Sequence, residues 1–397
     1  MLFKMAKASL TDPQGSVADV IFKVVSEEKL RQVVQEREDQ PLTYRQEVGQ
    51  VMRRSYGRHY RRMLGVILKT LRHANATLVN ATLAVRWPHI WGEGQVACAS
   101  DASKFAVRGE NLKSEWHVRY HGRGIMVYWH VERKSLAIYS QLKSPSSSEV
   151  ASMMEGILRH ETSMPIERHY VDTHGQSEMA FAFSHLLGFE LLPRLKNLAH
   201  QKLSRPDAQT YPNLEPILSK PIDWALIQQQ YDMLIQYAVA LRVGRADAET
   251  ILKRFTQTEV QHLTYRALAE LGKVIKTIFL CQYLSSQTLR REIDEGLNII
   301  ENWNSTNDYL AYGRGGELAG RRLLDHELSM LVLQLLQNSL IYVNTLMLQQ
   351  VLAKPYWFKR MTVADWWALT PLIYSHINPY GLFVLDLDQR IPLEATA

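Results

Sequence analysis

The sequence predicts a mixed α/β fold of the α+β kind, in which one sheet is joined to a large all-helical insertion and to helical segments at both ends. Two observations support this prediction. Short runs rich in Val, Ile, Tyr and Trp, separated by tight breaks, are confined to residues 94–203, and helical spacing of apolar residues fills most of the remaining chain. The 397 residues exceed one typical domain, so several domains are expected.

Residues 1–93 are predicted to form a basic, mostly helical flank. Tyr56 and Tyr60 are interleaved there with Arg45, Arg53, Arg54, Arg58, Arg61, Arg62, Lys69 and Arg72. Such a run is either a solvated helix face or a helix that contacts phosphates, and both interpretations stay open. The net charge of +6 is compatible with a polyanionic partner without requiring one.

The β signals begin at residue 96. Apolar and aromatic runs at 96–101, 114–121, 124–132 and 135–142 are separated by short breaks, which is typical of an antiparallel meander. Ser146 and Glu149 have capping-box spacing, so a helix is predicted from there to about His160. A strand that ends at Asp172, a helix over 177–187 and a short strand over 189–192 follow. A meander succeeded by parallel crossovers is the order of a ribonuclease H-like core, predicted over 94–203.

The second half of the chain is predicted to be helical. Four prolines between 204 and 221 indicate a connecting segment, and a helical insertion is predicted over 204–287. Residues 288–353 contain one amphipathic helix and the long apolar helix Leu323–Leu352, and residues 354–397 form a tail. Gln334, Gln337, Asn338 and Asn344 interrupt the apolar helix, so it is predicted to be buried rather than to span a membrane.

The cysteines and the N-terminus bear on the compartment. Cys98 and Cys281 lie far apart, so neither a disulfide framework nor a cysteine zinc cluster is indicated. Lys4 and Lys7 interrupt any signal-peptide core. A cytoplasmic protein is therefore expected.

Two aspartates mark the candidate chemistry. Asp101 and Asp172 each end a short apolar segment with the composition of a buried strand. Ligands of open α/β sheets bind outside the carboxyl ends of the strands, and two carboxylates placed there would repel each other unless a cation lay between them. Either residue alone could instead cap a helix or occupy a turn.

A third carboxylate is expected from the helix over 288–304. Leu289, Ile293, Leu297 and Ile300 form its apolar stripe, and Glu301 lies at the edge of that stripe. Asp294 is placed about as well, so periodicity alone does not choose between the two.

Longer motifs resemble the catalytic, carboxyl-terminal part of the Tn-three family of replicative transposases. The resemblance extends from about Val25 to about Arg390. The matching runs are Ser100-Asp101, Glu115-Trp116-His117 through Gly122-Arg123-Gly124, Tyr128-Trp129-His130-Val131, Asp172-Thr173-His174-Gly175-Gln176-Ser177-Glu178, Leu186-Leu187-Gly188-Phe189, Pro193-Arg194, Gly296-Leu297-Asn298-Ile299-Ile300-Glu301, Asn344-Thr345 and His376-Ile377-Asn378-Pro379-Tyr380-Gly381.

The resemblance implies a DDE site on a ribonuclease H-like fold, with Asp101, Asp172 and Glu301 as the catalytic and metal-binding triad. The spacings are 172 − 101 = 71 and 301 − 172 = 129 residues, the second lengthened by the helical insertion. It also implies two Mg²⁺ ions, replaceable by Mn²⁺, that serve 3′-end cleavage and strand transfer in replicative transposition. A separate recombinase would then resolve the cointegrate.

Partners are implied in the same way. They are the terminal inverted repeats and the target DNA, bound by a homo-oligomer, expected as a dimer on DNA in a bacterial cytoplasm, associated with the nucleoid when acting. The candidate DNA contacts are Arg123, His174, Arg194, Lys196, Lys202 and Arg314. For the basic side chains around Arg194, solvent exposure is the alternative.

Two rival functions remain at this point. Members of the family are normally more than twice this length, so the chain could be a truncated, catalytically idle remnant that binds DNA or full-length transposase. A carboxylate hydrolase such as a glycosidase would need a wider separation of two acids than a metal-sized cluster has.

Overall fold

The computed structural model describes residues 44–378, apart from short gaps at 93–95, 108–110, 119–120, 258–261, 312–315 and 319, together with residues 28, 31, 32 and 35. The chain divides into two units, Met1–Thr70 and Leu71–Ala397. The first unit contributes the beginning of the helix α4, Tyr44–Val85, in the predicted basic flank. The fold and the candidate site described below belong to the second unit.

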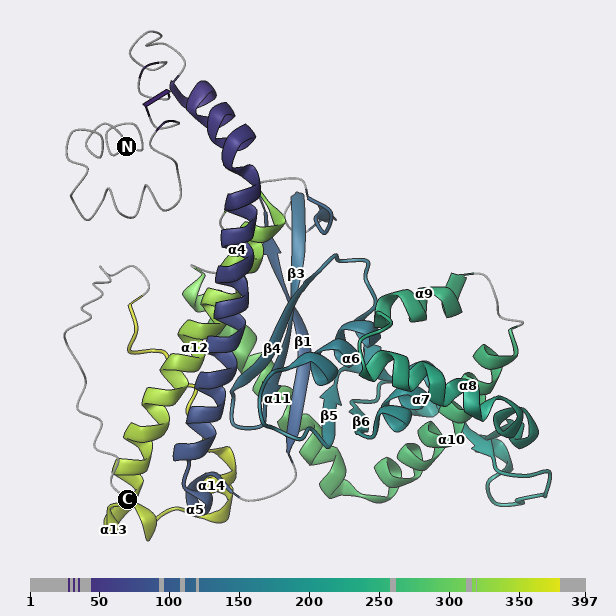
Figure 1. The fold of residues 1–397 in the computed structure, drawn as a ribbon. Coiled ribbons are helices and arrows are strands. Elements are labelled where there is room, and N and C mark those ends of the chain that lie inside the picture. Colours follow the sequence, from purple (N-terminus) through teal and green to yellow (C-terminus); the bar gives the residue numbers. More distant parts are fainter. Residues whose placement is uncertain are drawn as a thin grey trace. The chain divides into compact units, whose positions relative to one another are not determined.

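A six-stranded sheet forms the centre of this second unit (Figure 1). Its strands are β1 (Ala97–Ala106), β2 (Glu115–His117), β3 (Gly122–Glu132), β4 (Ala137–Lys143), β5 (Arg168–Val171) and β6 (Glu190–Pro193). β1, β2 and β4 each pair antiparallel with β3, so β1 neighbours β3 and not β2, as a meander of all four strands would require. β5 and β6 continue from β1 in parallel. The spatial order is β2-β3-β1-β5-β6, with β4 also paired to β3.

Helices cover both faces of the sheet, and β3 is accordingly buried without interruption from Gly124 to Glu132. The helix α6 (Glu149–Arg159) contacts β3 and β4, and α7 (Glu178–Leu187) contacts β6. The helix α11 (Gln287–Leu310) contacts β1, β3 and β5. Trp129 of β3 and Trp303 of α11 meet edge to face with ring centroids 5.5 Å apart, and both are fully buried. α11 is thereby fixed to the strand that neighbours β1.

The expected helical insertion contains α8 (Trp224–Arg242), α9 (Ala248–Gln257) and α10 (Leu263–Ser285), which gather beside β6 in Figure 1. α10 packs on α7 and α8. The segment before these helices differs from the prediction. It is not purely a linker, since β7 (Leu203–Arg205) and β8 (Leu218–Pro221) pair as a small parallel sheet.

The long apolar helix α12 (Leu323–Leu352) packs against β4, and two short helices follow it, α13 (Pro355–Phe358) and α14 (Val363–Ala368). Among the described residues, α12 is the one helix whose length and hydropathy would suffice to cross a bilayer. Its interrupting amides are nevertheless buried and bonded within the protein. Asn338 donates to the carbonyl of Ala137 and accepts from the N–H of Ala137, at 3.0 Å each. These contacts agree with the predicted role as a core helix.

One predicted helix start was wrong by two residues. Ser148, not Ser146, is the N-cap of α6, and its hydroxyl accepts from the N–H of Ala151. Ser146 instead donates its hydroxyl to the Glu115 carboxylate at 2.5 Å. Ser146 is therefore engaged by the Glu115 carboxylate of β2 and does not cap the helix, as its spacing from Glu149 had predicted.

Candidate active site

The parallel pairing of β1 with β5 brings Asp101 and Asp172 to one place. Ser100 lies opposite Val171 in the ladder, and the residue after each is an aspartate. The prediction that Asp101 ends its strand was wrong, because β1 continues to Ala106. Asp101 to Ala106 stay paired with β3 after β5 has ended. From Asp101 onward β1 is therefore paired only with β3. The side of β1 that β5 no longer covers is where the turn that begins at Asp172 lies.

The environment of Asp101 disfavours its charge. Burial raises the pKa of this carboxyl to about 6, and the carboxylates of Asp172, Glu149 and Glu301 act in the same direction, whereas a hydrogen bond from the N–H of Ala102 lowers the pKa. Asp101 and Asp172 are both half-buried. A bound cation would offset the electrostatic repulsion between these two carboxylates.

Asp101 is also held by a side chain that the sequence did not single out. The Asn304 Nδ2 atom of α11 donates to Asp101 Oδ2 at 3.1 Å. Ser103, two residues along β1, donates its Oγ to Asn304 Oδ1 at 2.5 Å. Asn304 follows Glu301 by one helical turn, and its place on the sheet side of α11 is the one signal that could have identified it.

Glu301 lies on the same helix but is not gathered with the aspartates. Its side chain is 56% exposed and forms an ion pair with Arg194 at 3.8 Å. Within the described part of the chain, no group of three His, Cys, Asp or Glu side chains has the arrangement of a metal site. Asp294, the alternative from periodicity, is exposed.

The donor set fits a hard divalent cation in part. Carboxylate oxygens are the ligands that Mg²⁺ prefers, and Asp101 with Asp172 could supply them. Glu301 is near enough to influence the charge of Asp101, and in this arrangement its partner is Arg194.

Two buried, neutral histidines, His130 of β3 and His169 of β5, lie on the strands that flank β1. The Ser100 hydroxyl bonds His169 Nε2 at 2.7 Å and the Tyr128 hydroxyl at 2.9 Å. Burial lowers the pKa of His130 to about 3, and burial together with His130 lowers the pKa of His169 well below its usual value. This buried network fixes Ser100, the residue just before Asp101.

Of the six residues predicted to contact DNA, Arg194 is placed next to a residue of the proposed triad. Arg194 lies beside Glu301, whereas Arg123 donates to the carbonyl of Ser114 at 3.1 Å. Lys196 is exposed, and Lys202, also exposed, donates to the carbonyl of Pro216 at 2.6 Å. Arg314 and the side chain of His174 lie outside the described residues.

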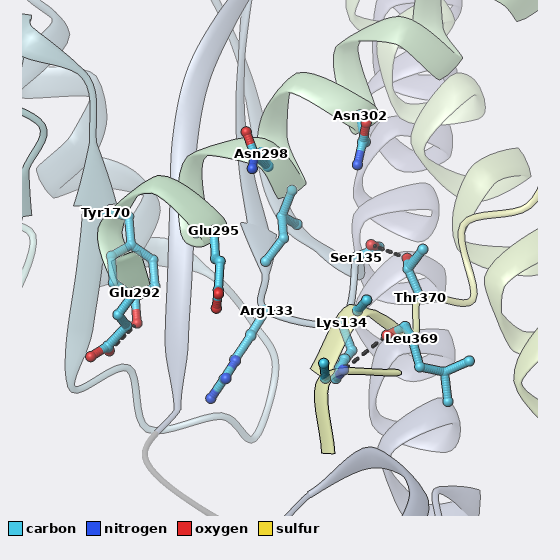
Figure 2. Close-up of a pocket in the computed structure, with 14 residues that line it drawn as sticks. Arg133, Lys134, Ser135, Tyr170, Glu292, Glu295, Asn298, Asn302, Leu369 and Thr370 are labelled. Atoms are coloured by element: carbon cyan, nitrogen blue, oxygen red, sulfur yellow. Dashed lines mark hydrogen bonds between the residues drawn. The ribbon is translucent and has the colours of Figure 1, made fainter. Parts of the chain in front are cut away.

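A separate cavity of about 430 Å³ lies along another part of α11 (Figure 2). Glu295, Asn298 and Asn302 line it from the helix, and Arg133 and Lys134 line it from the turn after β3. The N–H of Arg133 donates to the carbonyl of Ala97 at 3.1 Å, so the cavity adjoins the amino end of β1. None of the three predicted triad residues lines it.

Comparison with known proteins gives a consistent result. The model of the Tn3 transposase DDE domain matches residues 58–383. The transposase for transposon Tn1546 of Enterococcus faecium is 30% identical over 329 residues, which cover 81% of this chain and 33% of the relative. The transposase for transposon Tn501 of Pseudomonas aeruginosa is 28% identical over 333 residues, covering 81% of this chain and 33% of the relative. That for transposon gamma-delta of Escherichia coli K12 is 26% identical over 330 residues, covering 81% and 32%. The chain thus spans about a third of the length of the curated relatives that it matches.

Proposed function

This chain belongs to the Tn3 family of DDE transposases, and on that premise we propose that it carries the catalytic centre for 3′-end cleavage and strand transfer in replicative transposition. The observation that carries the proposal is the register Ser100 to Val171, which delivers Asp101 and Asp172 side by side. The α11 helix, which carries Glu301, packs on β1 next to them. We assign the sheet and its crossovers to a ribonuclease H-like core, in agreement with the strand order, and the helices α8 to α10 to an insertion in it.

In this proposal Asp101 and Asp172 hold divalent metal, and Glu301 completes the set. Held by these carboxylates, two Mg²⁺ ions would supply activation of the attacking oxygen and stabilisation of the leaving oxygen. The protein's part is to hold the carboxylates close together, which the buried network at Ser100 and the packing of α11 support. For Glu301 to join them, its side chain must exchange Arg194 for the metal.

The reaction has two phosphoryl-transfer steps. Water attacks the phosphodiester at a transposon end, the bond from phosphorus to the 3′ oxygen breaks, and a 3′-hydroxyl and a 5′-phosphate result. The freed 3′-hydroxyl then attacks a target phosphodiester and displaces another 3′ oxygen, so the number of phosphodiester bonds is conserved in this second step. The substrates are the terminal inverted repeats and target DNA. A dimer on DNA is the expected working form, because two ends must be joined together.

A second candidate is a catalytically idle chain that binds DNA or full-length transposase. The ion pair of Glu301 with Arg194 favours it, because the proposed third ligand is engaged elsewhere. The test is incubation of this chain alone with an end-containing duplex and Mg²⁺. Nicks at the 3′ ends that disappear with EDTA support the catalytic proposal. Specific binding of the duplex without any nicking supports the idle chain.

A further inference from the structure

We propose that Asn304 is a positioning residue that orients the Asp101 carboxylate and couples it to the helix turn carrying Glu301. This inference rests on the proposed function, since it gives Asp101 a role in metal binding. It goes beyond the triad, because Asn304 carries an amide and is not one of the three proposed carboxylate ligands.

The contact joins two distant parts of the chain, β1 and α11. Asn304 is half-buried, and its Nδ2 donates to Asp101 Oδ2 at 3.1 Å. Its Oδ1 accepts from the hydroxyl of Ser103 at 2.5 Å. Ser103 is only 8% exposed, so its end of this bridge lies away from water.

The chemistry of the three groups fixes how the amide is turned. An ionised carboxylate can only accept hydrogen bonds, so the Asn304 nitrogen must face Asp101. The amide oxygen then faces Ser103, whose hydroxyl can donate. Asp101 and Ser103 are two residues apart in a strand and therefore point to the same face, where one amide can bridge them. A rotated amide would put its oxygen against the Asp101 carboxylate and lose that bond, because neither oxygen could donate.

This bridge sets the relative position of two elements of the proposed site. Asn304 follows Glu301 by three residues, so the two side chains lie one turn apart on α11. A shift of α11 along the sheet by one turn would break both bonds of Asn304. Hydrogen bonds that orient metal-binding carboxylates typically change metal affinity by 10–100-fold. Asn304 is thereby expected to tune metal binding without touching the metal.

Two measurements on the full chain test the inference. The first is a double-mutant cycle of the urea midpoint with Asp101→Ala, Asn304→Ala and the pair. Coupling predicts that Asn304→Ala shifts the midpoint less when Asp101 is already absent. An equal shift in both backgrounds would overturn the contact, and this arm needs neither metal nor activity.

The second is Mn²⁺ binding by titration calorimetry for Asn304→Leu and Ser103→Ala, with Asn298→Leu as the matched control on the exposed side of α11. We expect at least about tenfold weaker binding for Asn304→Leu, a smaller loss for Ser103→Ala and no change for the control. A merely structural role would lower the urea midpoint but leave Mn²⁺ affinity unchanged, and that result overturns the inference. If Asp101→Asn binds Mn²⁺ like the parent chain, or the parent chain binds none, the proposed function fails instead.

Discussion

Ser100 of β1 lies opposite Val171 of β5, and this one register relation places Asp101 next to the start of the Asp172 turn. Two acidic side chains that are 71 residues apart in the chain thereby meet beside α11. A register slip by one residue would turn Asp101 to the opposite face of the sheet. The packing of both strands therefore determines whether this pair exists.

The carboxylates of the proposed site should be individually essential for cleavage. Replacing Asp101 or Asp172 by Asn, or Glu301 by Gln, removes a charge that the metals need. We expect the rate of Mg²⁺-dependent nicking to fall by more than about 100-fold in each variant. DNA affinity should change little, because phosphate contacts carry most of it. Asp294→Asn is the matched control on the same helix and should cleave like the parent chain.

The buried histidines predict a loss of stability in mild acid. In the unfolded chain a histidine has a pKa of about 6.5, whereas His130 folds with a pKa of about 3 and His169 with one well below its usual value. Below pH 6.5 the unfolded chain therefore binds protons that the folded chain does not. The contribution of these histidines to the unfolding free energy should be fully present above pH 6.5 and should decline as the pH falls towards 3.

This loss can be assigned by substitution. Each histidine contributes a slope of up to about 1.4 kcal/mol per pH unit between pH 6.5 and 5. His169→Gln should be less stable at neutral pH and should show a shallower slope than the parent chain in urea unfolding. An unchanged slope would contradict the assignment.

The buried amides of α12 should matter more than its exposed apolar residues. Asn338→Leu would leave the N–H of Ala137 without its amide partner in the core, while the Ala137 carbonyl would keep its bond from Gln334 Nε2 at 2.9 Å. We expect a loss of about 1–3 kcal/mol in unfolding free energy, because the N–H would be desolvated without compensation. Leu336→Ala, at a side chain 48% exposed, should cost less than about 1 kcal/mol. Similar losses for both variants would indicate that α12 is not seated as the structure shows.

The close approach of α11 to β5 depends on a glycine. A Cβ on Gly296 would lie 2.4 Å from Cδ2 of the buried Tyr170 ring. Gly296→Ala should therefore push α11 from the sheet, lowering stability by about 1–3 kcal/mol and slowing cleavage. Asn298→Ala, exposed on the same helix, should be neutral or slightly stabilising because alanine favours helix. A Gly296→Ala variant with normal stability and cleavage would show that α11 has room to adapt.

Much of the fold could be predicted from local patterns. The antiparallel strands are runs of β-branched and aromatic residues between tight turns, α11 has an apolar stripe at helical spacing, and α12 is a long apolar run. The continuation of β1 through Ala102 to Ala106 could not be predicted this way. That stretch has little strand propensity of its own and is held extended by the long partner β3.

The site could be predicted only as far as single positions. Asp101 and Asp172 follow from the ends of two strand-like runs, Glu301 is chosen over Asp294 by a motif resemblance, and the three remain predictions as a triad. The bridge from Ser103 through Asn304 to Asp101 joins side chains about 200 residues apart, so helical spacing could place Asn304 on the sheet side of α11 but could not reveal its partners. The choice of Arg194 as the partner of Glu301 is likewise a matter of tertiary packing.

Asp101 and Asp172 together are proposed to bind a divalent cation. A crystal of the full chain grown with Mn²⁺ tests it most directly, through anomalous difference density collected at the manganese edge. We expect a peak within coordination distance of both carboxylates, which disappears in the Asp172→Asn variant. Two results would contradict this binding: no peak at this position at saturating Mn²⁺, or a peak that persists unchanged in the Asp172→Asn variant.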